Sequence, residues 1–170
     1  MAAIRRMGAA ERRNRVGTPA HVSLAVDVSS EHVRTPLSRT AIADVVRRTL
    51  RGERVRHALV SVTLLNRRAM ARMNRTHLGH RGATDVISFG FTRATDADPV
   101  IGDIYICTDV ARQHAKACGV SVREEIARLA IHGVLHVLGY DHPDGDGRER
   151  STMWRRQEQL VKRVVVGIGR

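Results

Sequence analysis

The sequence predicts a single α+β domain in which a small mixed β-sheet of about four strands packs with about five helices. The chain has 170 residues, the usual size of one domain. Hydrophobic residues make up 42% and charged residues 27%, as in globular proteins, which argues against a disordered chain. Stretches with strand periodicity are interspersed with stretches of helical periodicity, which favours two or three packed layers.

Four stretches have the pattern of strands. From His21 onward apolar and polar residues alternate, with Val22, Leu24, Val26 and Val28 on one face. The other three stretches are short, apolar and bounded by turn or cap residues. They cover residues 57–65, 85–89 and 101–106.

Five stretches have the pattern of helices, with apolar residues three or four apart. The strongest begins after Ser121, because Ser121 and Glu124 form a capping box, and it ends at Gly139. Asn66 and Thr108 are expected to cap two others. The five predicted helices cover 42–50, 67–74, 108–118, 122–138 and a last stretch through 153–160, and residues 76–82 are predicted as a loop.

The first residues differ from the rest of the chain. Residues 1–20 are rich in Arg, Ala and Gly without apolar periodicity, so we expect a basic, mobile N-terminal arm, with the single domain covering residues 21–170. Residues 1–17 hold five arginines but no apolar segment of the kind that secretory signals have. No apolar run approaches the roughly 18 residues that span a bilayer, so a cytoplasmic protein without a membrane partner is expected.

The charge balance indicates a polyanionic partner. The chain has 29 basic and 17 acidic residues, a formal net charge of +12, which favours nucleic acid through counterion release. A bias of composition toward arginine is the alternative explanation. Aromatic residues make up only 3%, too few for a platform of stacked bases, so contacts with RNA or DNA should involve phosphates. The two cysteines, Cys107 and Cys118, fit neither a disulfide framework nor a zinc-thiolate site.

Three histidines have the spacing of a metal site. His132 and His136 are four residues apart on the strongest predicted helix, so their rings project from one face. Gly139 lets the chain turn back, and His142 then approaches the same point. Three neutral imidazoles suit zinc and leave one coordination position for water. Surface histidines, or core histidines with satisfied hydrogen bonds, are the alternative.

The segment HGVLHVLGYDH has the spacing of the metzincin protease helix, but with one difference. Metzincins carry the general-base glutamate directly after the first histidine, where this chain has Gly133. Glycine cannot accept a proton from zinc-bound water, so peptide hydrolysis would lack its base. Neutral ligands leave the full charge of the metal available for a phosphate oxygen. Phosphodiester cleavage is therefore the leading hypothesis and a metzincin-like metalloprotease a lesser one.

The run IHGVLHVLGYDH resembles the signature of the YbeY family of bacterial zinc-dependent endoribonucleases. Two further blocks are similar to that family, LNRRAMARMNRTHLGHRGATDVISFGF and IGDIYICTDVARQHAKACGVSVREEIARLAIHG, and the similarity covers about residues 21–165. The resemblance implies a cytoplasmic single-strand-specific endoribonuclease with a zincin-like helix. It implies action in 3′-end maturation of small-subunit rRNA, ribosome assembly and ribosome quality control, with the small subunit and assembly factors as partners. It also implies one zinc ion per chain, held by His132, His136 and His142.

One position departs from the family pattern. Many members have Tyr-Arg-Gly where this chain has His77, Leu78 and Gly79, and the resemblance implies that this arginine assists catalysis near the metal. Arg75, His77 and Arg81 are the candidates to replace it, if the loop folds over the metal.

Two other points stay open. Asp85 and Asp103 could each orient an imidazole or could cap turns. The missing arginine and the lack of an evident general base keep a second hypothesis, a non-catalytic rRNA-binding assembly factor with a structural metal.

Overall fold

The computed structural model describes residues 3–7, 24–95, 97–143 and 147–165. The strands are β1 (Ala3–Met7), β2 (Leu24–Ser30), β3 (Ala58–Leu65), β4 (Val86–Phe91) and β5 (Val100–Cys107). The helices are α1 (Arg39–Gly52), α2 (Arg67–Leu78), α3 (Thr108–Cys118), α4 (Val122–Val137), the 3-10 helix η1 (Arg148–Arg150) and α5 (Thr152–Val164). This order confirms the predicted α+β class and its five α-helices.

The strands form one mixed sheet in the order β1-β4-β5-β3-β2. β2, β3 and β5 are parallel neighbours, β4 is antiparallel to β5, and β1 is parallel to β4. Four of these strands correspond to the four predicted ones. Residues 21–23 of the first predicted strand lie outside the described residues.

The fifth strand, β1, was not predicted. It pairs Ala3 with Ile87 and Met7 with Phe91, so part of the expected arm forms an edge of the sheet. Its sequence has no alternation that would indicate a strand, and its hydrogen-bond partners come from the backbone edge of β4. Residues 8–20 of the predicted arm lie outside the described part of the chain.

Most predicted helix ends agree with the structure. The side chains of Ser38, Asn66 and Ser121 cap α1, α2 and α4 by accepting backbone N–H hydrogen bonds. Two expectations were wrong. α2 continues through residues 75–78, predicted to lie mainly in a loop, because Gly79 is the first residue to take a left-handed conformation, with φ +70°. The N-cap of α3 is Cys107, and the hydroxyl of Thr108 donates instead to the Leu65 carbonyl.

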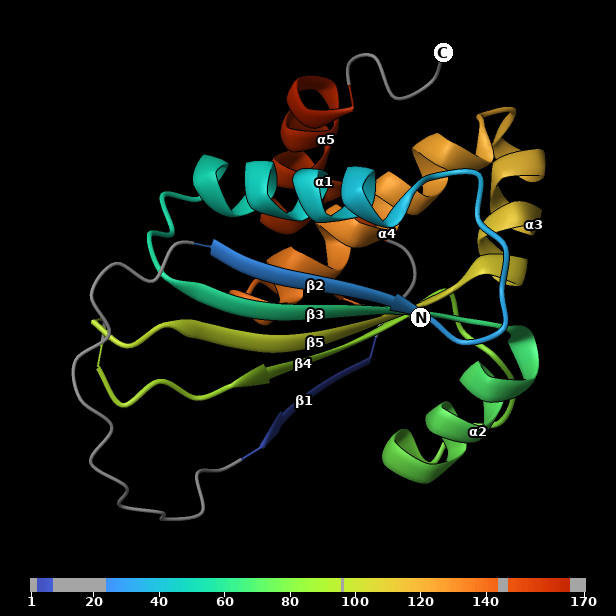
Figure 1. Cartoon of the computed structure of the whole chain (residues 1–170), viewed down its shortest axis with the longest axis horizontal. Coiled ribbons are helices and arrows are strands. Elements are labelled where there is room, and N and C mark those ends of the chain that lie inside the picture. Colours follow the sequence, from blue (N-terminus) through green and yellow to red (C-terminus); the bar gives the residue numbers. More distant parts are fainter. Residues whose placement is uncertain (1–2, 8–23, 96, 144–146, 166–170) are drawn as a thin grey trace.

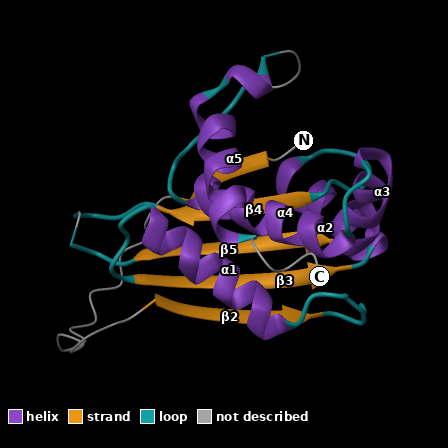
Figure 2. Cartoon of the chain, turned by 90° about the horizontal axis from the view of Figure 1, so that it is seen from above, coloured by secondary structure: helices purple, strands orange, loops and turns teal. Residues whose placement is uncertain are grey.

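The helices cover the sheet unequally. α1, α4 and α5 lie on one face, above the sheet in Figure 1, and the main hydrophobic core fills the space between them and the strands. α3 lies at one end of the sheet and α2 at the same end on the other face, as Figures 1 and 2 show. A smaller hydrophobic cluster joins α2 and α3 to the sheet through Met70, Phe89 and Val110.

Helix α4 lies very close to the strands because glycines face it. A Cβ atom on Gly102 of β5 would stand 2.5 Å from Val137 Cγ1, and one on Gly90 of β4 would stand 2.9 Å from the Val137 carbonyl oxygen. No other residue type would allow this approach without a shift of the backbone or of Val137. The metal-site helix is therefore fixed against the centre of the sheet.

None of the helices in the described residues is both long enough and apolar enough to span a membrane.

Candidate metal centre

Helix α4 places two of the three predicted histidines side by side. His132 and His136 are each only 2% exposed and lie one helical turn apart. The helix ends because Leu138 is its C-cap and Gly139 takes φ +92°, after which the Tyr140 N–H bonds back to the Leu135 carbonyl at 3.0 Å. This turn returns the chain toward the helix and brings His142 to the same point.

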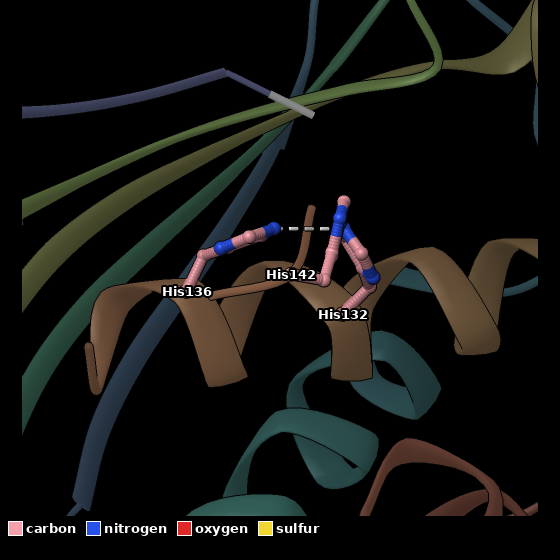
Figure 3. Close-up of side chains that lie close together, drawn as sticks. All are labelled: His132, His136 and His142. Carbon is pink, nitrogen blue, oxygen red and sulfur yellow. Dashed lines mark hydrogen bonds between the residues drawn. The ribbon is translucent and has the colours of Figure 1, made fainter. Parts of the chain in front are cut away.

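The three imidazoles converge as the spacing predicted. The Nε2 atoms of His132 and His136 are 3.0 Å apart, and one ring nitrogen from each of the three histidines lies within 4.8 Å of the others. The ring of His142 has its centroid 5.3 Å from that of His132 and 5.2 Å from that of His136. Figure 3 shows the three side chains turned toward one another above the α4 ribbon.

Each ring is oriented by a carbonyl oxygen on its outer nitrogen. His132 Nδ1 lies 2.7 Å from Gln157 Oε1, His136 Nδ1 lies 3.0 Å from the Tyr140 carbonyl, and His142 Nδ1 lies 3.1 Å from the Pro143 carbonyl. A carbonyl oxygen only accepts, so each Nδ1 must carry the hydrogen. The Nε2 atoms then carry lone pairs directed into the cluster.

This arrangement fits a cation. Two lone pairs 3.0 Å apart repel each other unless a proton or a metal lies between them. His142 Nε2 is buried, and it has no hydrogen-bond partner in the described part of the chain. Neutral imidazole is the commonest metal ligand, so three inward Nε2 atoms suit zinc and related divalent ions.

Sequence reasoning did not find Gln157. It lies on α5, is 3% exposed, and supplies the acceptor for His132. Of the two aspartates considered for such a role, Asp103 has its Oδ1 engaged by the Ser61 hydroxyl at 2.5 Å. Asp85 Oδ1 accepts from the Val86 N–H at 2.8 Å, and Asp85 also interacts electrostatically with His132. Only the packing of α5 on α4 identifies Gln157, because a glutamine in an amphipathic helix carries no local signal.

The structure explains why glycine follows the first histidine. A Cβ atom on Gly133 would stand 2.6 Å from Ile104 Cγ2 and 3.0 Å from Ser88 Oγ, so this face of α4 is pressed against β4 and β5. A glutamate at this position would project into the packed sheet. The general base that metzincins need therefore has no room here.

A cleft of about 430 Å³ opens beside His136. One wall is the end of α4, from His136 to Gly139, and the other is the segment from Gly90 to Thr95. Arg93 is the arginine in this lining, and nothing in its sequence context indicated a role. A guanidinium in a cleft that His136 also lines is suited to hold a phosphate.

The three residues predicted to replace the family arginine lie on α2 and in the segment that follows it. Arg75 and His77 are on α2, where His77 packs edge-on to Phe89 with ring centroids 5.8 Å apart. Arg81 lines a separate cavity with His80 and His114, and none of the three metal-site histidines is among the residues that line it. Their assisting role stays a prediction. Leu78, at the position of the family arginine, packs against the smaller hydrophobic cluster.

Comparisons with known proteins find relatives that cover most of the chain. The family model described as endoribonuclease YbeY matches residues 25–165. A protein named endoribonuclease YbeY from Frankia casuarinae is 35% identical over 149 residues, covering 81% of this chain and 73% of that protein. One of the same name from Bacillus licheniformis is 33% identical over 153 residues, covering 84% and 96%. A solution structure of a Thermotoga maritima protein superimposes with a TM-score of 0.58 at 20% identity, covering 83% and 89%, which shows the fold alone.

Proposed function

The chain belongs to the endoribonuclease YbeY family, and from that premise we propose that it cleaves single-stranded RNA with a zinc ion held by His132, His136 and His142. The observation that carries the proposal is the convergence of one ring nitrogen from each of the three histidines within 4.8 Å, on rings whose Nδ1 atoms are engaged by carbonyl oxygens. When bound, zinc supplies a Lewis acid that lowers the pKa of a coordinated water toward about 7.

The substrate proposed is the 3′-end region of small-subunit rRNA. In this proposal the chain acts in the cytoplasm in ribosome assembly and ribosome quality control, with the small subunit and assembly factors as partners. A net charge of +12 supports a polyanionic substrate, and the low aromatic content supports contacts with phosphates. Family membership supports a role in rRNA processing.

The chain's own residues supply binding and orientation. The acceptors on the three Nδ1 atoms keep the imidazoles in the tautomer that presents Nε2 to the centre. Arg93 lines the cleft beside His136, where its guanidinium would hold a non-bridging phosphate oxygen of the strand and offset its charge. Gly133 leaves no carboxylate at the metzincin base position, which agrees with a phosphodiester rather than a peptide substrate.

The proposal is tested by removing one imidazole. His136→Ala is expected to lose bound metal, measured by elemental analysis of the purified chain, and to lose cleavage of a single-stranded RNA by at least about 100-fold, because a three-ligand site loses a third of its donors. His142→Ala, at a half-exposed position, is the second variant if His136→Ala fails to fold. His80→Ala, an exposed histidine outside the centre, is the matched control and should retain both properties.

Two results would contradict the proposal. RNA cleavage at the wild-type rate by folded, metal-free His142→Ala would remove the metal from the mechanism. If the metal-loaded wild-type chain binds RNA but does not cleave it, the chain would be a non-catalytic rRNA-binding assembly factor with a structural metal. Elemental analysis also identifies the metal, because the same imidazoles bind nickel or cobalt.

A further inference from the structure

A second cleft continues from the cleft beside His136. It has a volume of about 590 Å³ and shares Arg93 and Leu138 with the first, so the two clefts have a common wall. Its other side is the connection between α1 and β3, which contributes Arg54, Arg56 and His57. The first cleft is lined by His136, and the second, on the other side of the common wall, is lined by residues at the end of α1.

Two connections far apart in the sequence form this second cleft. The connection from α1 to β3 and the connection from β4 to β5 lie at the same end of the sheet, on the left in Figures 1 and 2. The Val100 N–H donates to the His57 carbonyl at 2.9 Å, which joins the two connections directly. The cleft is thus anchored to the strands β3 and β5, whose first residues Ala58 and Val100 are in register.

The cleft has an excess of positive charge. Its glutamate, Glu53, is already paired: Oε1 lies 2.5 Å from Arg156 Nε, and Oε2 accepts the Tyr140 hydroxyl at 2.8 Å. This second contact and partial burial raise the pKa of Tyr140 and keep its hydroxyl neutral. Asp98 is the other acid, and its Oδ2 accepts the Thr95 N–H at 2.7 Å.

Arg54 and Arg56 remain available. Both are exposed, and no carboxylate in the described residues lies within ion-pair distance of either guanidinium. Exposed arginines without acidic partners, on a concave surface beside a site for phosphate chemistry, are suited to bind further phosphates.

The backbone at Arg54 gives an independent indication. Arg54 has φ +59° and directly follows the cap of α1, with its N–H bonded to the Arg51 carbonyl at 2.9 Å. Glycine is the residue that helix ends favour in this left-handed conformation, because a Cβ atom is strained there. Arg54 keeps this conformation although glycine would be less strained there, and it lines the second cleft.

We propose that the second cleft binds backbone phosphates of the RNA strand next to the cleavage point, with Arg54 and Arg56 as the donors. This inference rests on the proposed function, because it extends the substrate path of the same site. Phosphate contacts carry no sequence information, so the cleft would strengthen binding of all single-stranded RNAs alike. It would act on substrates long enough to reach from the metal centre to the end of α1.

The test compares two double variants that each remove two positive charges. Arg54→Gly with Arg56→Ala changes the cleft, and Lys162→Ala with Arg163→Ala changes an exposed part of α5. Both lower the net charge equally, so long-range attraction of RNA is matched. Arg54→Gly also favours the left-handed backbone, so this substitution is expected to leave the Tm unchanged or higher.

Binding is measured with a fluorescent single-stranded RNA in chains that also carry His142→Ala, so that the RNA stays intact. The cleft variant is expected to bind roughly tenfold more weakly at about 0.1 M salt, and its salt-dependence slope is expected to fall by about 1.4 for two lost contacts with a single strand. The α5 variant should bind the RNA with the same affinity and salt dependence as the chain that carries His142→Ala alone. In chains that retain His142, the cleft variant is expected to raise KM for a long RNA by a similar factor and to keep kcat within about twofold.

The outcomes separate this inference from the proposed function. If the wild-type chain cleaves RNA and the two double variants bind and cleave alike, the second cleft is not an RNA subsite and the proposed function stands. If the wild-type chain does not cleave RNA, the proposed function fails, and a weaker, less salt-dependent complex of the cleft variant would still assign RNA binding to this cleft. A lower Tm of Arg54→Gly with unchanged binding would give Arg54 a structural role and overturn the inference.

Discussion

At the scale of single residues, the orientation of the three imidazoles depends on oxygen atoms that lie outside the histidine cluster. Three carbonyl oxygens, from Gln157, Tyr140 and Pro143, engage the Nδ1 atoms of the three histidines. Two of these oxygens belong to the backbone, where no substitution removes them. Gln157 is the side chain in this set, so it is where a mutation can change the orientation of an imidazole without changing a ligand.

Gln157→Leu is expected to weaken metal binding by about 10- to 100-fold, because the buried Nδ1–H of His132 loses its acceptor and the tautomer is no longer fixed. The unfolding free energy should fall by about 1–3 kcal/mol for the unsatisfied donor. Competition with a coloured chelator measures the affinity, and denaturant titration measures the stability.

Gln159→Leu is the matched control, since Gln159 lies on the same helix but is exposed. Equal metal affinity of Gln157→Leu and Gln159→Leu would show that the contact to His132 does not position the ring.

At the scale of elements, the position of the metal centre is set by how closely α4 approaches the sheet. Gly90 and Gly102 on the strands and Gly133 on the helix remove the side chains that would hold α4 away from β4 and β5. The face of α4 next to His132 is thereby pressed against Ile104. If the helix shifted along the strands, side chains such as those of Ile104 and Val137 would clash with the facing element. The histidines therefore keep a fixed position relative to the sheet.

Gly133→Ala should destabilise the fold although alanine is the better helix former. Helix propensity alone favours alanine by about 1 kcal/mol. The added methyl would stand 2.6 Å from Ile104 Cγ2, and overpacking of this kind costs about 1–3 kcal/mol. Denaturant unfolding of the purified variant is the measurement.

Ile104→Ala provides the partner for a double-mutant cycle, because it removes the Cγ2 atom that the new methyl would meet. In that background Gly133→Ala should cost less or stabilise the chain. If Gly133→Ala changes the free energy of unfolding equally in the chain with Ile104 and in the chain with Ile104→Ala, the contact with Ile104 Cγ2 is not the cause of the destabilisation.

At the scale of the whole molecule, the metal centre joins three segments. His132 and His136 come from α4, His142 from the turn that follows, and Gln157 from α5. α5 is further joined to the rest of the fold, because Arg156 pairs with Glu53 near the end of α1 and Glu158 pairs with Arg128 of α4. A cation at the centre would bind the folded chain and not the separate segments, so its binding energy adds to the stability of the fold.

Zinc at about 100 times its dissociation constant is expected to add about 2.7 kcal/mol, which for a chain of this length raises the Tm by roughly 5–10 °C. A chelator should reverse the shift. Thermal unfolding with and without the metal is the measurement, with His80→Ala as the control that keeps the shift. An equal rise in Tm for His142→Ala would place the stabilising metal at another site of the folded chain.

Several local features of the fold and the convergence of the three histidines could be predicted from the sequence. Helix caps at Asn66 and Ser121 depend on side chains that bond to backbone a few residues away, and the pair His132 and His136 depends on helical spacing. The position of His142 could be predicted because Gly139 marks the turn that returns the chain toward the helix. In each of these interactions the two partners lie within about ten residues of each other in the sequence, so a local sequence pattern contains both of them.

The tertiary structure alone decided the features whose partners lie far apart in the chain. Gln157 is 25 residues from the histidine that it orients, and the second cleft brings the end of α1 against the connection between β4 and β5. β1 is a strand because β4 offers it a backbone edge, although its own sequence has no strand pattern. The sequence determined which histidines could hold a metal ion. The packing of the helices on the sheet decided which residues orient those imidazoles and where the two clefts lie.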